Sequence, residues 1–457
     1  MDLRNATCAA NPHARAARAD LARRCARVSR ACVVGEQLVL HGTSSGEAEN
    51  LRRVMDDLPD VKLFQSRLRA QQRRSVVLAS ELSQTPSYLP LALMARNALR
   101  LRNRSSNGKL HAALWQTRPQ SAPRPSFSLR PAVVFFTTYP MSIIELYVRA
   151  VVLLDQAECE GMLGGDRERA RLFPSMWEPS LRFLLDPYAL PGAVQPLAPL
   201  PAAEELDTIH NADGSPAFWK AYDRYVAGLA PFQRAREGAG CFETVHVCDF
   251  ANSDLRYRTA RPWHTMQHWL QHRGYTYDPA PRLQASPSGP LRVVFVRRSG
   301  RRRISNLAEL HTECGAWRPE RVTCEKHDLG ALGMDGAAKL MRRTDVLVSM
   351  HGADLINGLM MHAGATVVEI TPVVKANCPC DMLRPMFLAP ADRAMQHIRL
   401  DSTNRSHMSG PLHGTMHADH FVPWPSIRRA LETVLDIGGR ADAFDRWNDS
   451  PDSTIPY

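Results

Sequence analysis

Long apolar runs are missing from this chain of 457 residues. No window approaches the run of about 18 apolar residues that a membrane-spanning helix needs. The first thirty residues are rich in Ala and Arg without an apolar stretch, so they do not have the pattern of a secretory signal. We also find no internal repeat and no heptad run, which excludes repeat architectures and long coiled coils.

Clear metal-binding patterns are scarce as well. The second half of the chain contains no Asp-x-Asp motif, and Cys378-Pro-Cys380 lacks the second cysteine pair of a zinc site and the spacing of a redox dithiol. A disulfide or a buried thiol is the favoured interpretation of that pair. His413, His417 and His420 would gather three imidazoles if their segment were helical. The glycines and prolines around them argue against a regular helix, so a metal site there is the less favoured alternative.

What the chain has in excess is positive charge, with a net value of +11. Residues 1–130 hold 22 Lys and Arg against 9 Asp and Glu, whereas the rest of the chain holds 35 against 37. A basic segment can bind polyanions or an anionic membrane surface, so a weak contact of that kind through residues 1–130 is one interpretation. A solvated helical face is the commoner use of such charge, and we favour it.

Proline-rich breaks divide the chain, which at 44% apolar residues is long enough for two or three domains. They predict four parts. These are a variable, basic N-terminal region over 1–130, an α/β domain over 131–278, a nucleotide-binding α/β domain over 290–425, and a C-terminal helix with a tail over 426–457.

The most informative stretch is residues 345–372, DVLVSMHGADLINGLMMHAGATVVEITP. Residues 346–348 and 366–370 have the composition of buried strands, and between them a His-Gly-Ala turn precedes a short segment with helical spacing. In open α/β sheets such a turn lies at the carboxyl end of a strand, where ligands bind. The free N–H groups at the start of the helix suit a phosphate.

Two side chains in this stretch favour a functional site over an ordinary βαβ unit. His351 stands at the tip of the first strand, where packing gives no reason for it. Glu369 lies within an otherwise apolar strand, where an unpaired carboxylate would be costly. The plain alternative is that Gly352 serves packing alone, and the turn shape by itself favours that alternative.

A second stretch, residues 291–310, joins a buried strand over 293–296 to a loop of five arginines, and a helix is expected to start near Asn306. Arginine forks bind phosphate oxygens in a bidentate way and stay charged at physiological pH. We therefore interpret Arg298 and Arg302 as a diphosphate clamp. For Arg301 and Arg303 a solvated loop position is favoured.

Together, residues 295–306 (FVRRSGRRRISN) and residues 345–372 resemble the family 61 glycosyltransferases. This group contains plant xylosyl- and arabinosyltransferases and animal protein O-linked GlcNAc transferases. The resemblance spans about residues 290–372, with several motifs in the same order and at the same distances. The residues that match the family pattern are Arg298, Arg302, Ile304, Asn306, His351, Gly352, Ala353, Asn357 and Glu369.

The resemblance implies an α/β fold of GT-B type, with two facing Rossmann-like domains and a helical, basic N-terminal extension. It implies an inverting, metal-independent transfer of a sugar from a nucleotide-diphosphate sugar, with a UDP-sugar favoured, to a hydroxyl of a glycan or glycoprotein. Arg298 and Arg302 would neutralise the leaving diphosphate, His351 would bind a phosphate or the sugar, and Glu369 would be a ribose or scaffold contact. No cofactor or metal is expected.

Upstream the resemblance is weaker. Residues 133–154 are similar to the segment in which relatives carry Asn-x-x-His followed by an acidic residue on a helix. Here Thr137 and Pro140 replace the asparagine and the histidine, while Glu145 keeps the acidic position and is our candidate for the general base. His246 and Asp249 are the next candidates. Leu307 also replaces the usual glutamate after Asn306.

Two other functions remain open. The departures at Thr137 and Pro140 would suit a catalytically degenerate relative that binds a nucleotide sugar or a glycan. A basic nucleic-acid-binding protein is less favoured, because the half with the motifs is nearly neutral and lacks aromatic residues among its arginines. The resemblance implies a location in the Golgi or ER lumen, so we expect an anchor to be missing from this N-terminus or supplied otherwise. Asn-x-Ser/Thr acceptor triplets start at Asn5, Asn103 and Asn404.

Overall fold

The computed structural model describes residues 14–34, 37–40, 45–56, 76–77, 87–90, 112–114, 126–136, 143–165, 169–174, 184–188, 240–250, 261–275, 289–372, 383–388, 392, 394–410, 418–437 and 454–457. The chain forms two compact units. An N-terminal unit comprises Pro12–Arg256, and a C-terminal unit comprises Tyr257–Tyr457 with Met1–Asn11.

The C-terminal unit is built on a six-stranded sheet in the order β10-β9-β11-β12-β13-β16, and every neighbouring pair is parallel. Its inner strands are rich in Val and Ile, and all residues of β11 and β12 are buried, as a parallel sheet covered on both faces requires. The strands are β9 (Leu291–Val296), β10 (Val322–His327), β11 (Val346–Met350), β12 (Thr366–Thr371), β13 (Gln396–Asp401) and β16 (Thr454–Pro456).

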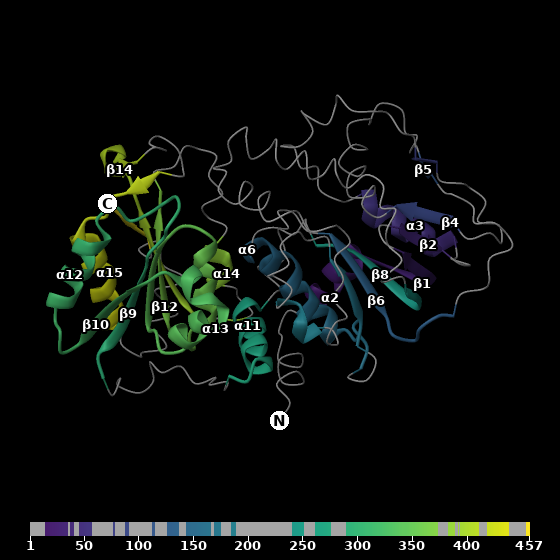
Figure 1. Ribbon diagram of the computed structural model, residues 1–457, viewed down its shortest axis with the longest axis horizontal. Helices are drawn as coiled ribbons and strands as arrows, with labels where there is room; N and C mark the ends of the chain where they lie inside the picture. Colours follow the sequence, from purple (N-terminus) through teal and green to yellow (C-terminus); the bar gives the residue numbers. More distant parts are fainter. Residues whose placement is uncertain are drawn as a thin grey trace. The chain divides into compact units, whose positions relative to one another are not determined.

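Helices cover both faces of this sheet (Figure 1). On one side lie α12 (Leu307–Ala316) and α15 (Trp424–Ile437), and on the other lie α11 (Pro262–His272), α13 (Leu329–Met341) and α14 (Arg384–Phe387). The apolar face of α15 enters the core through Ile427, Leu431 and Val434, as its predicted amphipathic pattern requires. The strands, the helix start at Asn306 and the last helix are thus confirmed, and the coarse α/β prediction holds.

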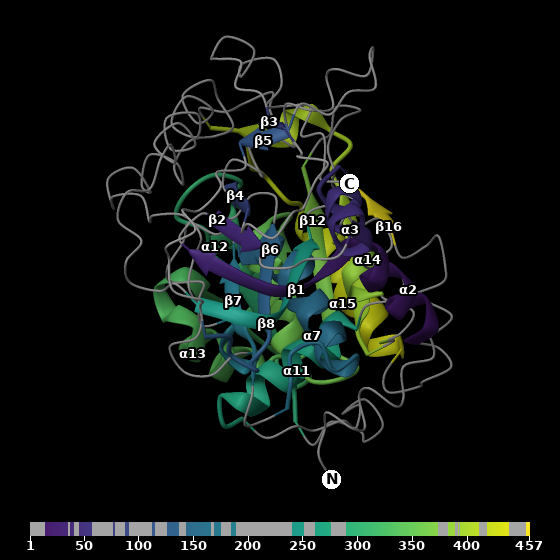
Figure 2. The ribbon, with the colours of Figure 1, turned by 90° about the vertical axis from the view of Figure 1, so that its right-hand side faces the viewer.

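The N-terminal unit carries a mixed sheet in the order β4-β2-β1-β8-β6-β7. Strand β1 is antiparallel to both β2 and β8, whereas β6 is parallel to β8 and β7. Figure 2 shows β1 beside β8, and β6 pairs with the other edge of β8. The strands are β1 (Cys25–Val34), β2 (Gln37–Leu40), β4 (Ser87–Pro90), β6 (Ala132–Phe136), β7 (Arg171–Pro174) and β8 (Gly240–Asp249), and a separate parallel pair joins β3 (Val76–Val77) to β5 (Ala112–Leu114).

The predicted boundary at residue 130 falls inside a single sheet, because β1 pairs with β8, and β2 and β4 extend the same sheet on the other side of β1. Its described helical segments are α2 (Ala14–Arg24), α3 (Ser45–Asp56), α6 (Ile143–Leu146), the π-helical turn η2 (Tyr147–Val151), α7 (Val152–Cys159) and the 3-10 turn η4 (Asp186–Tyr188). The predicted domain over 131–278 likewise extends past the end of this unit at Arg256.

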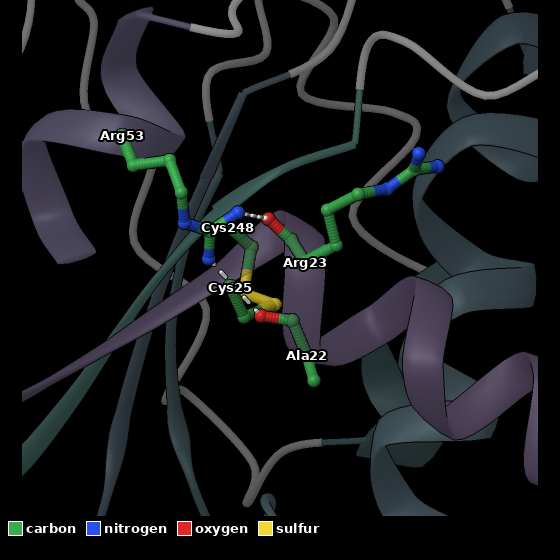
Figure 3. Close-up of a disulfide and its surroundings, with 5 residues drawn as sticks. All are labelled: Ala22, Arg23, Cys25, Arg53 and Cys248. Atoms are coloured by element: carbon green, nitrogen blue, oxygen red, sulfur yellow. Dashed lines mark hydrogen bonds between the residues drawn. A yellow bond between two sulfur atoms is a disulfide. The ribbon is translucent and has the colours of Figure 1, made fainter.

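Two disulfides join β1 to β8, between residues that face each other across the two strands. Cys25 is bonded to Cys248 and Cys32 to Cys241. Arg53 of α3 lies beside the first disulfide (Figure 3). Its Nη1 donates a hydrogen bond of 2.8 Å to the carbonyl of Arg23, which belongs to the last turn of α2. A cation there satisfies carbonyls that a helix end leaves unpaired. At least this arginine of the basic region therefore has a structural use.

A third disulfide, Cys314–Cys324, ties α12 to β10 in the C-terminal unit. No cysteine among the described residues is free. Within the same part of the chain, no helix has both the length and the apolar character to cross a membrane. Cys378 and Cys380 lie outside the described residues.

Candidate active site

The predicted His-Gly-Ala turn lies at the carboxyl end of β11, as expected. His351 donates its backbone N–H to the carbonyl of Ile370 at 2.8 Å, which fixes the turn beside the end of β12. Gly352 has φ 156° and ψ −174°. A Cβ on this glycine would lie only 2.5 Å from Nη1 of Arg298. The glycine is therefore required because a guanidinium packs against its backbone.

Arg298 reaches this turn from the loop after β9. Its Nη1 donates to the carbonyl of His351 at 3.3 Å, and its Nε pairs with Asp354 Oδ2 at 3.0 Å. Its side chain is 15% exposed, so the ion pair is only partly screened by solvent. The sequence prediction that Arg298 belongs to the same site as the turn is consistent with these contacts.

Arg302 lies in the same loop and is nearly buried, with 9% of its surface exposed. Its backbone has φ 56°, an uncommon conformation for a residue other than glycine. Its guanidinium makes no hydrogen bond or ion pair within the described part of the chain, and Nε is sealed from solvent. Burial lowers the pKa of this guanidinium, and the charges of Arg298 and Arg301 lower it further, although Asp354 opposes them. A buried guanidinium without a hydrogen bond among the described residues is costly, and a bound anion would offset that cost.

Glu369 holds two histidines below the turn. It accepts hydrogen bonds from Nδ1 of His351 and from Nε2 of His397 on β13, the latter at 2.8 Å. Burial alone would raise the pKa of this carboxyl, but the two hydrogen bonds outweigh burial and lower it to about 2. Glu369 is fully buried, which fits the scaffold alternative of the sequence prediction. Because Nδ1 of His351 is taken by Glu369, Nε2 is the ring atom left to meet a ligand.

The helix after the turn is a 3-10 helix, η6 (Ala353–Met360), in place of the expected α-helix. Asn357 donates from Nδ2 to the carbonyl of Asp354 at 2.7 Å, so it shapes the first turn of η6. Gly358 lets the helix approach β12, because a Cβ there would lie 2.7 Å from Val367 Cγ2. Ala353 opens the helix next to Arg298. Helix α11 donates from Gln267 and Trp263 to carbonyls at the other end of η6.

Two residues of the arginine stretch have structural contacts. Asn306 forms a reciprocal pair with the backbone of Val422, donating at 2.9 Å and accepting at 3.0 Å. Arg303, interpreted from sequence as a solvated loop residue, pairs with Asp419 through Nε and Nη2 at 2.9 and 2.6 Å. Its side chain is 50% exposed, as expected of a solvated loop position, and the pair also fastens the arginine loop to β15 (Asp419–His420). For Asn306, both the nitrogen and the oxygen of the side-chain amide are thus hydrogen-bonded to the backbone of Val422.

The acceptor-side predictions are less fully described. Glu145 lies in α6, directly before the π-helical turn η2, and its side chain is outside the described set. Thr137, Pro140, His413 and His417 lie outside the described residues, as does the side chain of Asp249. His246 is on β8, where burial and the charge of Arg27 lower its pKa to about 4.

Sequence reasoning missed two site residues. Asp354 stands three residues after His351 in the first helical turn, and its acidity was the signal that it could compete for Arg298. His397 lies on β13, whose sequence QHIRLD mixes polar and apolar residues, so no local irregularity distinguished it. Its contact with Glu369 arises from the pairing of β13 with β12.

Comparison with protein-family models matches residues 179–368 to the family described as Glycosyltransferase 61. The matched region contains the arginine loop, the His351 turn and η6, and it ends one residue before Glu369. Glu145 lies outside it. No curated protein matches the chain.

Proposed function

We propose that this chain, a member of glycosyltransferase family 61, moves a sugar from a nucleotide-diphosphate sugar to a hydroxyl of a glycan or glycoprotein. Membership of the family implies glycosyltransferase activity in general. A UDP-sugar is the favoured donor, and a pentose or a hexosamine is the favoured sugar. The reaction inverts the anomeric centre and needs no metal ion.

The buried guanidinium of Arg302 is the observation that carries this proposal. A diphosphate is a partner with the right sign, size and hydrogen-bonding capacity for Arg302 and Arg298 together. Its negative charge would counter both the burial of Arg302 and the repulsion from Arg298, which together lower the pKa of Arg302. The same two cations would stabilise the charge on the departing diphosphate, the task that a divalent cation performs in other sites.

Asp354 occupies the place that the donor phosphate would take. In the free protein its carboxylate neutralises Arg298. A phosphate that replaces this carboxylate would bind Arg298 as well as Arg302. Asp354, with a third of its side chain exposed, would then turn to solvent. The charge arrangement therefore supports exchange of one anion for another at Arg298.

The turn residues have matching roles in the proposal. Gly352 and Ala353 let the backbone approach the phosphates closely. His351, held by Glu369, would present Nε2 to a phosphate or to the sugar. Asn357 fixes the first turn of η6, whose N–H groups face the anion, and Asn306 keeps the arginine loop against residue 422.

The acceptor side belongs to the N-terminal unit in this proposal, and the mixed sheet of that unit departs from the parallel sheet of the expected Rossmann-like domain. The acceptor oxygen would attack the anomeric carbon as the bond from that carbon to the diphosphate oxygen breaks, and Glu145 would take the hydroxyl proton. The π-helical turn η2, which begins two residues after Glu145, supports the assignment, since such turns are frequent at functional sites. The described disulfides support the luminal location, Golgi or ER, because disulfides persist in oxidising compartments.

A second candidate function is binding of a nucleotide sugar without transfer. The replacement of the family's asparagine and histidine by Thr137 and Pro140 favours it. Both functions need the same diphosphate site, so binding alone does not separate them. Turnover of the donor does.

One experiment tests the proposal in two stages. UDP-sugars and GDP-sugars are screened for thermal stabilisation of the protein, and each donor that binds is then offered with glycan and peptide acceptors, with and without EDTA. We expect stabilisation by a UDP-sugar and a transfer rate that EDTA leaves unchanged. Loss of transfer in EDTA that Mn²⁺ or Mg²⁺ restores would contradict the metal-independent mechanism. Binding without donor cleavage would favour the second candidate.

A further inference from the structure

Asn404 begins an Asn-Arg-Ser triplet at residues 404–406, the acceptor pattern for N-linked glycosylation. It stands in the loop after β13, where it caps the 3-10 turn η8 (Arg405–His407). We propose that Asn404 carries an N-linked glycan. The assignment concerns a modification of the chain and does not depend on the reaction that the chain catalyses.

The side chain of Asn404 is arranged to accept this modification. Its Oδ1 accepts a hydrogen bond from the backbone N–H of Ser406 at 2.9 Å. Its Nδ2, the atom to which the glycan is attached, donates no hydrogen bond within the described part of the chain. Thr403, Asn404, Arg405 and Ser406 are all exposed, so a sugar on Nδ2 meets solvent and displaces no packed side chain.

The backbone around the triplet is fixed without help from Nδ2. Thr403 donates from both its backbone N–H and its hydroxyl to the carbonyl of Tyr457, each at 2.8 Å. The backbone N–H of His407 donates to the carbonyl of Asn404 at 3.1 Å. A glycan on Nδ2 therefore breaks none of the contacts that hold this loop, and the folded protein tolerates it.

The disulfides supply the second, independent observation. Three are formed among the described residues, two of them between strands that are more than 200 residues apart in the chain. No described cysteine is free. Such a pattern points to folding in an oxidising compartment. Acceptor triplets in surface loops of chains that enter this compartment are where N-linked glycans are attached.

The chemistry requires a lipid-linked oligosaccharide diphosphate and the transferase that uses it. The bond from Nδ2 to the anomeric carbon forms as the bond from that carbon to the lipid diphosphate breaks. The lipid diphosphate leaves, and the proton lost by Nδ2 passes to a base of that transferase. Ser406 supplies the hydroxyl that the acceptor pattern requires.

The test is mass mapping of the full chain, produced with an added leader in a eukaryotic secretory host. Peptide N-glycosidase in heavy-oxygen water converts a glycosylated asparagine to a labelled aspartate. We expect the label at position 404 in most chains, its loss in Ser406→Ala, and its retention in Ser406→Thr. The two serine variants keep Asn404 and its backbone, so a folding defect does not confuse the result.

The cysteines are mapped in the same preparation by alkylation without reduction. We expect Cys25–Cys248 and Cys32–Cys241 to be paired. An unmodified Asn404 in chains whose cysteines are paired would overturn the proposal, because those chains reached the compartment and were not glycosylated there. Reduced cysteines in the secreted protein would contradict folding in an oxidising compartment, and the assignment of a glycan to Asn404 would fall with it.

Discussion

The guanidinium of Arg298 lies against the backbone of Gly352, and a Cβ at Gly352 would come within 2.5 Å of its Nη1. Gly352→Ala should therefore push Arg298 out of the site and weaken nucleotide-diphosphate binding as much as Arg298→Ala does. The alanine should also cost about 1–3 kcal/mol of stability, because φ 156° disfavours a side chain. Calorimetric titration with UDP and urea unfolding measure the two effects.

The double variant makes this prediction specific. If Gly352 acts through Arg298, the two substitutions together should weaken binding no more than either does alone. Gly315→Ala is the matched control, since nothing lies within 4 Å of its Cβ position. Additive losses of binding in the double variant would show that Gly352 acts independently of Arg298.

Asp354→Asn should tighten nucleotide-diphosphate binding. The substitution removes the carboxylate that pairs with Arg298, so the phosphate no longer has to displace it. We expect a gain of about 0.2–1 kcal/mol, the scale of a partly exposed ion pair. The free protein should become less stable, because Asp354 also offsets the charge of Arg302. Asp335→Asn, which breaks a surface pair with Arg273, is the control, and weaker binding in Asp354→Asn would refute the exchange of anions.

Glu369 predicts a pH dependence of stability. Its folded pKa of about 2 lies below the ordinary value of 4.5 for a glutamate, so its hydrogen bonds stabilise the fold above pH 4.5. That stabilisation is lost as the pH falls from about 4.5 through about 2. Glu369→Gln should be destabilised at neutral pH, by about 1–3 kcal/mol, because its amide leaves a buried histidine N–H without an acceptor. Urea unfolding of both proteins across this range should show their difference shrinking as the pH falls, whereas a constant difference would contradict the assignment.

Glu145→Gln should keep nucleotide-sugar binding while lowering transfer by about two to four orders of magnitude, the usual contribution of a positioned base. The amide is isosteric, so folding should be preserved. Steady-state transfer rates and donor affinity are the two measurements. Normal transfer by the variant would remove Glu145 from the mechanism and direct attention to His246 and Asp249.

How much the sequence could predict depended on the range of the interaction. The strands β9, β11 and β12 and the turn at Gly352 follow from local composition, because β-branched runs and a glycine between them leave few alternatives. The left-handed backbone of Arg302, the pair of Arg303 with Asp419 and the contact of Glu369 with His397 depend on segments distant in sequence. No local pattern specifies them.

The N-terminal region shows the same limit more strongly. Residues 25–34 alternate cysteine, arginine and small residues, and their charge suggested a solvated, basic extension. In the structure they form β1, whose partner β8 lies more than 200 residues away and is joined to it by two disulfides. Cysteine count alone could not identify those partners.

The central claim is that Arg298 and Arg302 bind the diphosphate of a nucleotide sugar, and calorimetric titration of UDP into matched variants tests it most directly. Arg298→Ala should weaken binding by about 1.5–3 kcal/mol, the value of a charge-assisted hydrogen bond. Arg302→Met should weaken it as well and, unlike Arg298→Ala, should stabilise the free protein, because it removes a buried cation that makes no hydrogen bond or ion pair among the described residues. Arg297→Ala, in the exposed neighbouring position, should change neither quantity. Unchanged UDP affinity in folded Arg298→Ala and Arg302→Met proteins would contradict the account.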